Sequence, residues 1–333
     1  MILQFDPKPL RDALADAEPG VLDGRAVSSA RLSQLEPLVE QLIARGGQPT
    51  LCVVQVGDDD ASSLYIRHKI RACSKVGVDS RHIHLPADIT RDALLARLRK
   101  LNDDPSLHGI LLQLPLPDHL DQDEPIRSID PGKDVDGFHP VNLGCMMSRR
   151  SILEPCTPRG VLTLLQAAGI DPTGKEAVVI GRSVIVGRPM SLMLTRANAT
   201  VTTCHRHTID LEKEVRRAEI LVVATGVAEL VKGEWIREGA VVVDVGISRK
   251  DGKLSGDVEF DAARERAAWI TPVPGGVGPM TVATLLENTV RAACVHHGVV
   301  ARNGEIVDAE QRGLEYKITA GLGITTLQRR RSN

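Results

Sequence analysis

Aromatic residues are scarce in this chain, at 2% of 333 residues, so its hydrophobic cores must be built from aliphatic side chains. Long apolar runs are missing too: none reaches the ~18 residues that a membrane-spanning helix needs, and the N-terminus lacks a signal-peptide core. A net charge of −2 gives no overall field that would attract nucleic acid or a membrane. These absences predict a cytoplasmic protein without nucleic-acid or membrane partners.

The cysteines and histidines also lack the spacing that is typical of metal ligands. The six cysteines contain no Cys-x-x-Cys pair, and several lie in apolar runs, where cysteine behaves as a small hydrophobe. Histidines form three close pairs without acidic or thiol ligands at metal spacing: His82 and His84, His205 and His207, His296 and His297. We therefore expect free thiols and no metal ion.

Short apolar runs alternate with helical patterns, which predicts parallel βαβ units in two α/β domains. The expected strands are 50–56, 109–114, 176–181, 200–205, 219–226 and 240–246. The expected helices are 28–45 (interrupted by Pro37), 61–75, 90–102 (N-cap Thr90), 156–169 (N-cap Thr157) and 281–297. Residues 1–22 show no clear period and are expected to form a loose leader. A domain junction is placed at 156–169, before a dinucleotide-type sheet.

The segment VVIGRSVIVGRPM predicts a phosphate site. A strand ends at Gly181 and a helix begins near Gly187, so backbone N–H groups would face an anion at the helix N-terminus. The glycine spacing is not G-x-G-x-x-G, so an ordinary tight turn remains an alternative. The next strand ends in His-Arg-His with no acid for a ribose hydroxyl, and Arg182 and Arg206 favour a 2′-phosphate, hence NADP. Alternatively, Arg206 simply faces solvent.

Three further segments carry polar or conformationally special residues. Tyr65 and Lys69 lie four apart on a predicted helix and so share a face, although a solvated surface pair is the simpler reading. Gln113 lies in a buried strand and needs hydrogen-bond partners. The loop 272–281 is dense in Pro and Gly, which suits close backbone approach to a ligand or an elaborate helix entry; whether a proline there is cis is not decided. The segment 132–140 alone reads as a polar turn.

Seven motifs in order resemble the bifunctional methylenetetrahydrofolate dehydrogenase/methenyltetrahydrofolate cyclohydrolase family. They are SSLYIRHK, LLQLPLP, PGKDVDGFHPVN, PCTPRGV, VIGRSVIVGRPM, VDVGI and PVPGGVGPMTVATLLENT. The resemblance runs from about Asp23 to about His297 and leaves 1–22 and 299–333 outside. It implies an N-terminal α/β domain, a C-terminal Rossmann-like NADP domain, folate in the cleft between them and a homodimer. The first domain would be discontinuous, 1–158 plus 283–333, around 159–282.

The resemblance also implies the reactions. The chain would oxidise 5,10-methylene-tetrahydrofolate with NADP, which needs no general base, and hydrolyse the methenyl product to 10-formyl-tetrahydrofolate, which needs an acid/base. This chemistry belongs to one-carbon metabolism and purine biosynthesis. A dehydrogenase of another small substrate, a member with one activity, and a non-catalytic binding protein are the alternatives. The 299–333 tail is expected to be dispensable for chemistry.

Site residues are carried over by motif. In the family the tyrosine at the position of Tyr65 stacks on the folate, the lysine at Lys69 moves protons, Gln113 hydrogen-bonds that lysine, and Asp136 binds the pterin. Those four are the expected catalytic residues, and the substrate-binding set adds Leu114, Pro274, Gly275 and Gly276. The expected cofactor-binding residues are Gly181, Arg182, Ser183, Val186, Gly187, Arg206 and Ile247.

Overall fold

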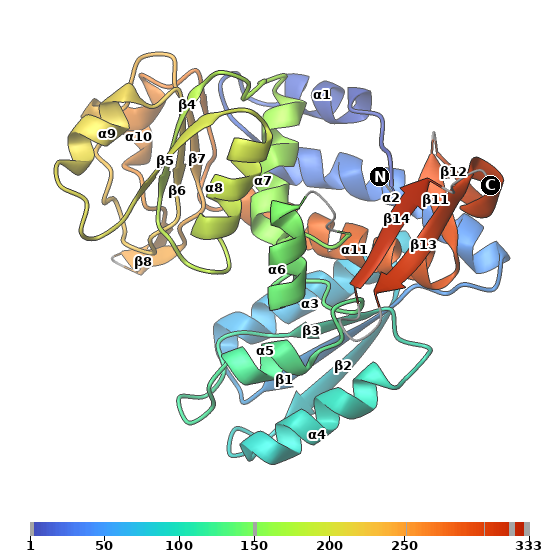
Figure 1. Cartoon of the computed structure of the whole chain (residues 1–333). Coiled ribbons are helices and arrows are strands. Elements are labelled where there is room, and N and C mark those ends of the chain that lie inside the picture. The colour runs from blue at the N-terminus through green and yellow to red at the C-terminus, as the bar shows by residue number, and fades with distance from the viewer. Residues whose placement is uncertain (1–2, 149–151, 251, 303, 320–323, 330–333) are drawn as a thin grey trace. The chain divides into compact units, whose positions relative to one another are not determined.

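The computed structural model describes residues 3–148, 152–250, 252–302, 304–319 and 324–329. The chain divides into two compact units (Figure 1). Unit 1 consists of Met1–Asp6, Leu32–Glu154 and Leu285–Asn333; unit 2 consists of Pro7–Arg31 and Pro155–Thr284. Helices α2 (Gly24–Ala44) and α11 (Val277–His296) each contribute residues to both units.

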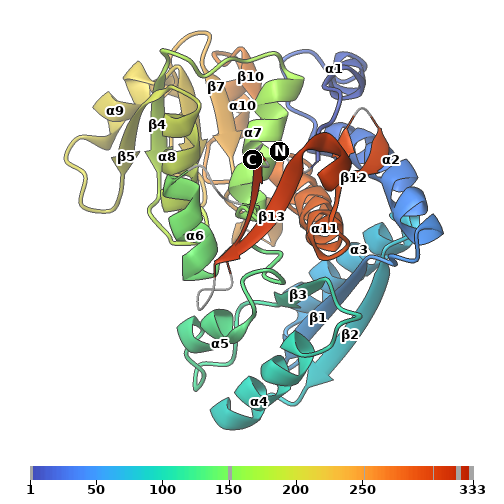
Figure 2. The ribbon, with the colours of Figure 1, turned by 45° about the vertical axis from the view of Figure 1, so that its right-hand side comes forward.

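Unit 1 contains a three-stranded parallel sheet in the order β2-β1-β3, which Figure 2 shows with β1 (Thr50–Val56) in the middle. The flanking strands are β2 (Asp79–Leu85) and β3 (Gly109–Leu112). Because β1 and β3 are buried on both faces, they read as continuous apolar runs. The helices are α3 (Asp60–Val76), α4 (Arg91–Asn102), α5 (Asp123–Ser128) and α6 (Pro140–Met147).

The C-terminal tail adds two antiparallel hairpins to unit 1. They are β11 (Val299–Arg302) with β12 (Glu305–Asp308), and β13 (Leu314–Thr319) with β14 (Ile324–Arg329), joined by η2 (Glu310–Arg312). A small apolar cluster that includes Val300, Ala309 and Leu314 lies beneath them. The tail therefore has a core of its own.

Unit 2 contains a five-stranded parallel sheet in the order β10-β7-β6-β4-β5. Its strands are β4 (Glu176–Ile180), β5 (Thr200–Cys204), β6 (Ile220–Val223), β7 (Val241–Asp244) and β10 (Trp269–Ile270), and a short hairpin pairs β8 (Ser248–Lys250) with β9 (Lys253–Ser255). Its helices are α1 (Lys8–Ala15), α7 (Cys156–Ala167), α8 (Gly187–Arg196), α9 (Leu211–Arg217), α10 (Phe260–Arg264) and η1 (Gly233–Trp235). The core is aliphatic, as the scarcity of aromatics requires.

Several local predictions were wrong. The expected leader holds α1, whose Leu10 and Leu14 are buried, and this segment belongs to unit 2 rather than to the first domain, where the sequence analysis placed it. The helix expected at 28–45 begins at Gly24 and continues through Pro37. Helix α11 begins at Val277, four residues before its predicted start.

The predicted cap of α7 was also wrong. Its N-cap is Pro155, without a side-chain cap bond, and the Thr157 hydroxyl instead pairs with the Thr281 hydroxyl at 3.0 Å. Strand β2 was missed because its side chains are mostly exposed or half-exposed. The Thr90 cap of α4 is confirmed, since its hydroxyl accepts from the Ala93 backbone N–H at 3.3 Å.

Candidate active site

Helix α3 brings Lys69 against Gln113 in unit 1. The helix is fixed at its start by Asp59, whose carboxylate accepts from the Ser62 backbone N–H, and at its end by Gly77 in the left-handed conformation. Lys69 is buried, and its Nζ donates to Gln113 Oε1 at 2.9 Å. The structure therefore joins two predicted site residues that lie 44 positions apart.

Gln113 is held in the orientation that this contact requires. Its backbone N–H donates to Val54 O at 2.9 Å, continuing the β1·β3 ladder, and its Nε2 donates to Leu114 O at 2.7 Å. Because the amide nitrogen is already engaged, the amide oxygen faces Lys69. Leu114 is followed by a cis peptide bond to Pro115.

Tyr65 lies one helical turn before Lys69 and is half-buried. Burial raises the pKa of its hydroxyl above the ordinary value. A half-buried aromatic face next to a buried amine can accept a flat, partly polar ligand.

The loop between α5 and α6 uses its two aspartates, Asp134 and Asp136, differently. Asp134 is buried, and its Oδ2 accepts from the His139 backbone N–H and from Asn142 Nδ2, both at 2.8 Å. Burial raises the pKa of Asp134. Asp136 is half-exposed, and Gly137 follows it at φ 76. Asp134 therefore anchors the loop, which leaves Asp136 as the residue of the pair that a ligand can reach.

Two more side chains, which the sequence analysis missed, hold this loop. Lys133 Nζ donates to the carbonyl oxygens of Asn102 and Asp104 at 2.6 and 2.7 Å, at the C-terminal end of α4. Asn288 Nδ2 donates to Val135 O at 2.8 Å. Because their partners are distant backbone atoms, only the clustering of polar residues in 132–136 could have suggested these roles.

In unit 2, the turn between β4 and α8 depends on two glycines. Gly181 has φ 119, and a Cβ on it would lie 2.2 Å from Ala224 O. A Cβ on Gly187 would lie 2.2 Å from Gly181 O. Ser183 Oγ accepts from the backbone N–H groups of Val186 and Gly187 at 3.1 and 3.3 Å, which shapes the turn. The backbone is thus closely folded at the start of α8, as a phosphate site requires.

Exposed side chains surround this turn. Arg182 is exposed directly after Gly181, and Arg206 is exposed beyond the end of β5, with its Nε donating to His207 Nε2 at 3.0 Å. Large aliphatic side chains that are 46–52% exposed follow the ends of three neighbouring strands: Val184, Val227 and Ile247. In open α/β sheets this carboxyl edge is the usual ligand site. Of these three residues, only Ile247 was predicted from the sequence to bind the cofactor.

Two buried aspartates, also missed, tie the loops of this edge together. Asp244 accepts from the backbone N–H groups of Gly246, Asp257 and Val258. Asp257 Oδ2 accepts from the backbone N–H groups of Thr225 and Gly226. Burial, with a smaller contribution from Asp257, raises the pKa of Asp244 to about 7. Hydrogen bonds to this pair of buried aspartates therefore hold the loops after β6 and β7 together.

The predicted Pro-Gly loop is tightly built. The Val273–Pro274 bond is cis. Pro274 is exposed, whereas Gly276 is buried and donates its backbone N–H to Pro272 O at 2.8 Å. A Cβ on Gly276 would lie 2.6 Å from Thr271 Cβ, so only glycine fits. This loop belongs to unit 2, whereas Lys69 belongs to unit 1.

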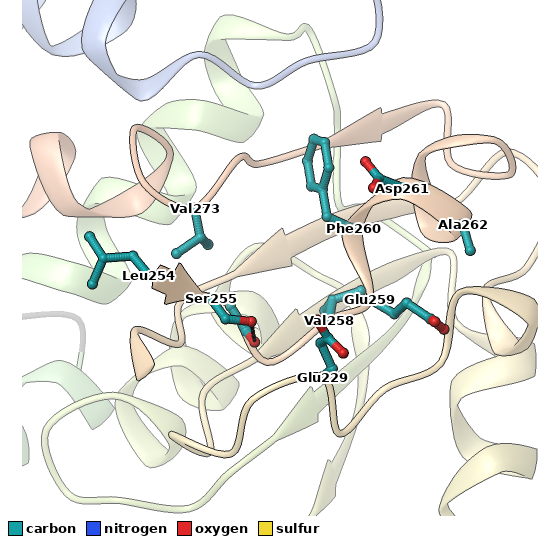
Figure 3. Close-up of a pocket in the computed structure, with 10 residues that line it drawn as sticks. Glu229, Leu254, Ser255, Val258, Glu259, Phe260, Asp261, Ala262 and Val273 are labelled. Carbon is teal, nitrogen blue, oxygen red and sulfur yellow. Dashed lines mark hydrogen bonds between the residues drawn. The ribbon is translucent and has the colours of Figure 1, made fainter. Parts of the chain in front are cut away.

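A pocket of about 410 Å³ opens in unit 2 beside this loop (Figure 3). Its lining includes Val273, Phe260 and the acidic residues Glu229, Glu259 and Asp261. None of the predicted site residues lines it. The acidic side chains in its lining do not suit a phosphate group.

Comparison with known proteins identifies the family. The family model for the tetrahydrofolate dehydrogenase/cyclohydrolase catalytic domain matches residues 22–136, and that for the corresponding NAD(P)-binding domain matches residues 155–297. The chain belongs to this family. Both matches agree with the extent predicted from the seven motifs.

This chain covers almost the whole length of the relatives that it matches. "Bifunctional protein FolD 2" from Myxococcus xanthus is 55% identical over 282 residues, which are 84% of this chain and 97% of the relative. The crystal structure of the bifunctional dehydrogenase/cyclohydrolase FolD from Campylobacter jejuni is 48% identical, with a TM-score of 0.79 over 82% of this chain and 98% of that one. The Trypanosoma brucei enzyme, solved with NADP and an inhibitor, is 41% identical, with a TM-score of 0.79 over 83% and 98%.

These findings confirm the two-domain α/β fold, the dehydrogenase/cyclohydrolase class and an NAD(P)-binding domain. The alternative of an unrelated dehydrogenase is set aside. Along the described chain, no helix has both the length and the apolar character needed to cross a bilayer.

Proposed function

We propose that this chain oxidises 5,10-methylene-tetrahydrofolate to the methenyl compound with NADP and hydrolyses that product to 10-formyl-tetrahydrofolate. The observation that carries the proposal is the hydrogen bond from the buried Lys69 to the half-buried Gln113 in a member of this family. Unit 1, which holds Lys69 and Gln113, would be the folate-binding catalytic domain, and unit 2, which includes residues 159–282, would be the NADP-binding domain.

NADP, when bound, accepts the hydride that leaves the one-carbon bridge. The residues present fit this group, because Gly181 and Gly187 permit a closely folded turn at the N-terminus of α8. Ser183 shapes that turn, and Val186 lies at its end as the N-cap of α8. Arg182, assisted by Arg206, binds the 2′-phosphate, and the exposed Ile247 supplies an apolar surface. Oxidation leaves a cation spread over two nitrogens and releases no proton, so positioning is the main task of the protein in this step.

Hydrolysis needs proton transfer, and Lys69 provides it. Water adds to the methenyl carbon, its oxygen loses both protons as it becomes the formyl carbonyl, one ring nitrogen gains a proton as the C–N bond breaks, and one proton is released overall. Lys69 Nζ, which Gln113 Oε1 holds in place, can relay one proton from the water oxygen to the ring nitrogen, and the other proton passes to solvent. Tyr65, one turn away on the same helix, stacks on the folate.

We assign substrate binding to Asp136 and Leu114 in unit 1 and to Pro274, Gly275 and Gly276 in unit 2, with Asp136 as the anchor of the pterin. The support for this role is that Asp134 fixes the loop while Asp136 remains half-exposed. Asp136→Ala should weaken folate binding and lower both activities, because both use one bound pterin. Unchanged folate affinity with only one activity lowered would contradict a shared anchor, and Asp92→Ala, at an exposed position on α4, serves as the control.

The decisive assay measures NADPH formation with 5,10-methylene-tetrahydrofolate and, separately, hydrolysis of the methenyl compound. Both rates should be present, with NADP preferred over NAD. A protein that performs neither reaction would overturn the proposed function.

We further propose that the chain is a cytoplasmic homodimer that supplies formyl groups for purine biosynthesis. The six cysteines are free thiols, mostly buried, which fits a reducing compartment. Light scattering of the purified protein measures the oligomer, and a monomer at working concentration would contradict the dimer.

A further inference from the structure

Three histidines from distant parts of the sequence meet in unit 1. His108 immediately precedes β3, His296 is the last residue of α11, and His297 follows it. The ring centroids lie 5.1 Å apart for His108 and His296, 5.3 Å for His108 and His297, and 5.0 Å for His296 and His297. One ring nitrogen of each histidine lies within 4.8 Å of the other two. The sequence alone reveals only the His296/His297 pair, because nothing local connects His108 to it.

His108 presents an unsatisfied nitrogen to this cluster. Its side chain is 5% exposed, and its Nε2 is buried without a hydrogen-bond partner. Its Nδ1 accepts from the Thr50 backbone N–H at a long 3.3 Å. Buried polar atoms are normally paired, so an unpaired ring nitrogen beside two other imidazoles needs an explanation. His296 and His297 are exposed, so an ion can reach the cluster from solvent.

We propose that His108, His296 and His297 form a binding site for a divalent transition metal, with Zn²⁺ as the best fit. Imidazole nitrogens suit zinc and its neighbours rather than magnesium or calcium. Tetrahedral zinc at about 2.0–2.1 Å from each nitrogen brings the nitrogens to about 3.4 Å from one another. The two exposed rings would have to close on His108 from their present spacing, and a water would fill the fourth position.

Two features oppose binding and one favours it. Coordination at His108 Nε2 moves the proton of the neutral ring to Nδ1 and gives up the long bond from Thr50. Lys133 lies near enough to act electrostatically on His108, although backbone carbonyls partly offset its charge. In favour, the C-terminal end of the 20-residue helix α11 carries a partial negative charge that attracts a cation.

The site would be structural. Gln113 follows the carboxyl end of β3, whereas His108 precedes its start, so the two lie about 16 Å apart along the strand. A metal at His108 would join the start of β3 to the end of α11 and would not touch the bond between Gln113 and Lys69.

The test is calorimetric titration of the chelator-treated full chain with Zn²⁺. The expected result is one ion per chain, with affinity falling by about 10-fold or more in His296→Gln and in His297→Gln. His119→Gln, an exposed histidine outside the cluster, should leave zinc affinity unchanged. Bound Co²⁺ should give the visible absorption of a tetrahedral site, and Zn²⁺ should raise the unfolding temperature of the wild type but not of the His296→Gln/His297→Gln double variant.

The exposed pair is the decisive target, because substitution of the buried His108 could disturb folding. Absence of stoichiometric zinc binding in the wild type would overturn the site. Zinc affinity in the folded double variant within about twofold of wild type would overturn it as well.

Discussion

The two proposed functional regions of this molecule depend on different chemical groups. In unit 1 the key groups are side chains: the Lys69 amine is buried and hydrogen-bonded to a fixed amide. In unit 2 they are backbone atoms, shaped by Gly181 and Gly187, with Arg182 exposed beside them. Proton transfer requires a desolvated side chain in one orientation, whereas dinucleotide binding requires close backbone approach and a reachable cation. We therefore expect substitutions at Lys69 to impair proton transfer and substitutions at Arg182 to impair cofactor binding.

The sharpest separation comes from Lys69→Met, which keeps the length of the side chain and removes the amine. Hydrolysis of the methenyl compound should fall by about 10²- to 10⁴-fold, the usual worth of a positioned acid/base. Hydride transfer should persist, because that step releases no proton. Separate assays of the two rates measure this, with the exposed Lys75→Met on the same helix as control. Wild-type hydrolysis in Lys69→Met would end the assignment.

A second test asks whether the buried anchor of unit 2 acts on stability rather than on chemistry. The folded-state pKa of Asp244, about 7, lies above the ordinary value of 3.8. Between these values the folded protein holds a proton that the unfolded chain has lost. The contribution of Asp244 to stability should therefore be largest at or below pH 4, fall by at most about 1.4 kcal/mol per pH unit as pH rises towards 7, and change no further above that.

Asp244→Asn should flatten this slope, whatever it does to absolute stability by replacing one hydrogen-bond acceptor with an amide group. Urea unfolding between pH 4 and 8 measures it, and the exposed Asp261→Asn provides the control. An unchanged slope in Asp244→Asn would show that another group, such as the buried Asp134 of unit 1, dominates the pH dependence.

Arg182 tests the cofactor region with a smaller expected effect. A charge-assisted hydrogen bond contributes roughly 1.5–3 kcal/mol, so Arg182→Ala should weaken NADP by about 10- to 100-fold. NAD affinity should change little, because NAD lacks the 2′-phosphate. Dissociation constants for both cofactors measure this, with Arg196→Ala at the far end of α8 as control. Arg206→Ala should follow the same pattern more weakly. Equal weakening of both cofactors by Arg182→Ala would contradict the 2′-phosphate role.

The same contrast explains what the sequence could predict. Strands β1 and β7 are buried along their whole length, so they appear as apolar runs that a local pattern reveals. Strand β2 has no such run and was missed. Tyr65 and Lys69 share a helix face, which spacing alone predicts. The meeting of Lys69 with Gln113 is tertiary, and only the family resemblance anticipated it.

Residues that act through distant backbone atoms were beyond local patterns. Asp257 accepts from an N–H group 32 positions away, and His108 meets a histidine 188 positions away (296 − 108). Such roles depend on how the strands are ordered in the sheets, which composition and periodicity do not specify. Asp134 shows a related limit: its sequence context matches that of Asp136, and only burial separates the anchor from the exposed partner.

The smallest expected effect on chemistry is that of removing the tail. The family model ends at residue 297, and no proposed site residue lies beyond it. The first hairpin is nevertheless tied to α2: Gln41 Nε2 donates to Gly304 O and Gln41 Oε1 accepts from the Ile306 backbone N–H, both at 2.8 Å. The Tyr316 hydroxyl donates to Val299 O at 2.6 Å.

Truncation after Gly298 should keep both turnover numbers within about twofold while lowering the unfolding temperature, because buried Val300 and Ile306 are lost.

Truncation after Gly313, which keeps β11 and β12, is the matched control and should fall between the full chain and the shorter one. NADP affinity should be equal in all three proteins, because the tail belongs to unit 1 and the cofactor residues to unit 2. Thermal unfolding and both assays measure the outcome. A truncated protein that stays folded and binds NADP but no longer hydrolyses the methenyl compound would show that the tail acts on the Lys69 region, and the dispensable-tail prediction would then be wrong.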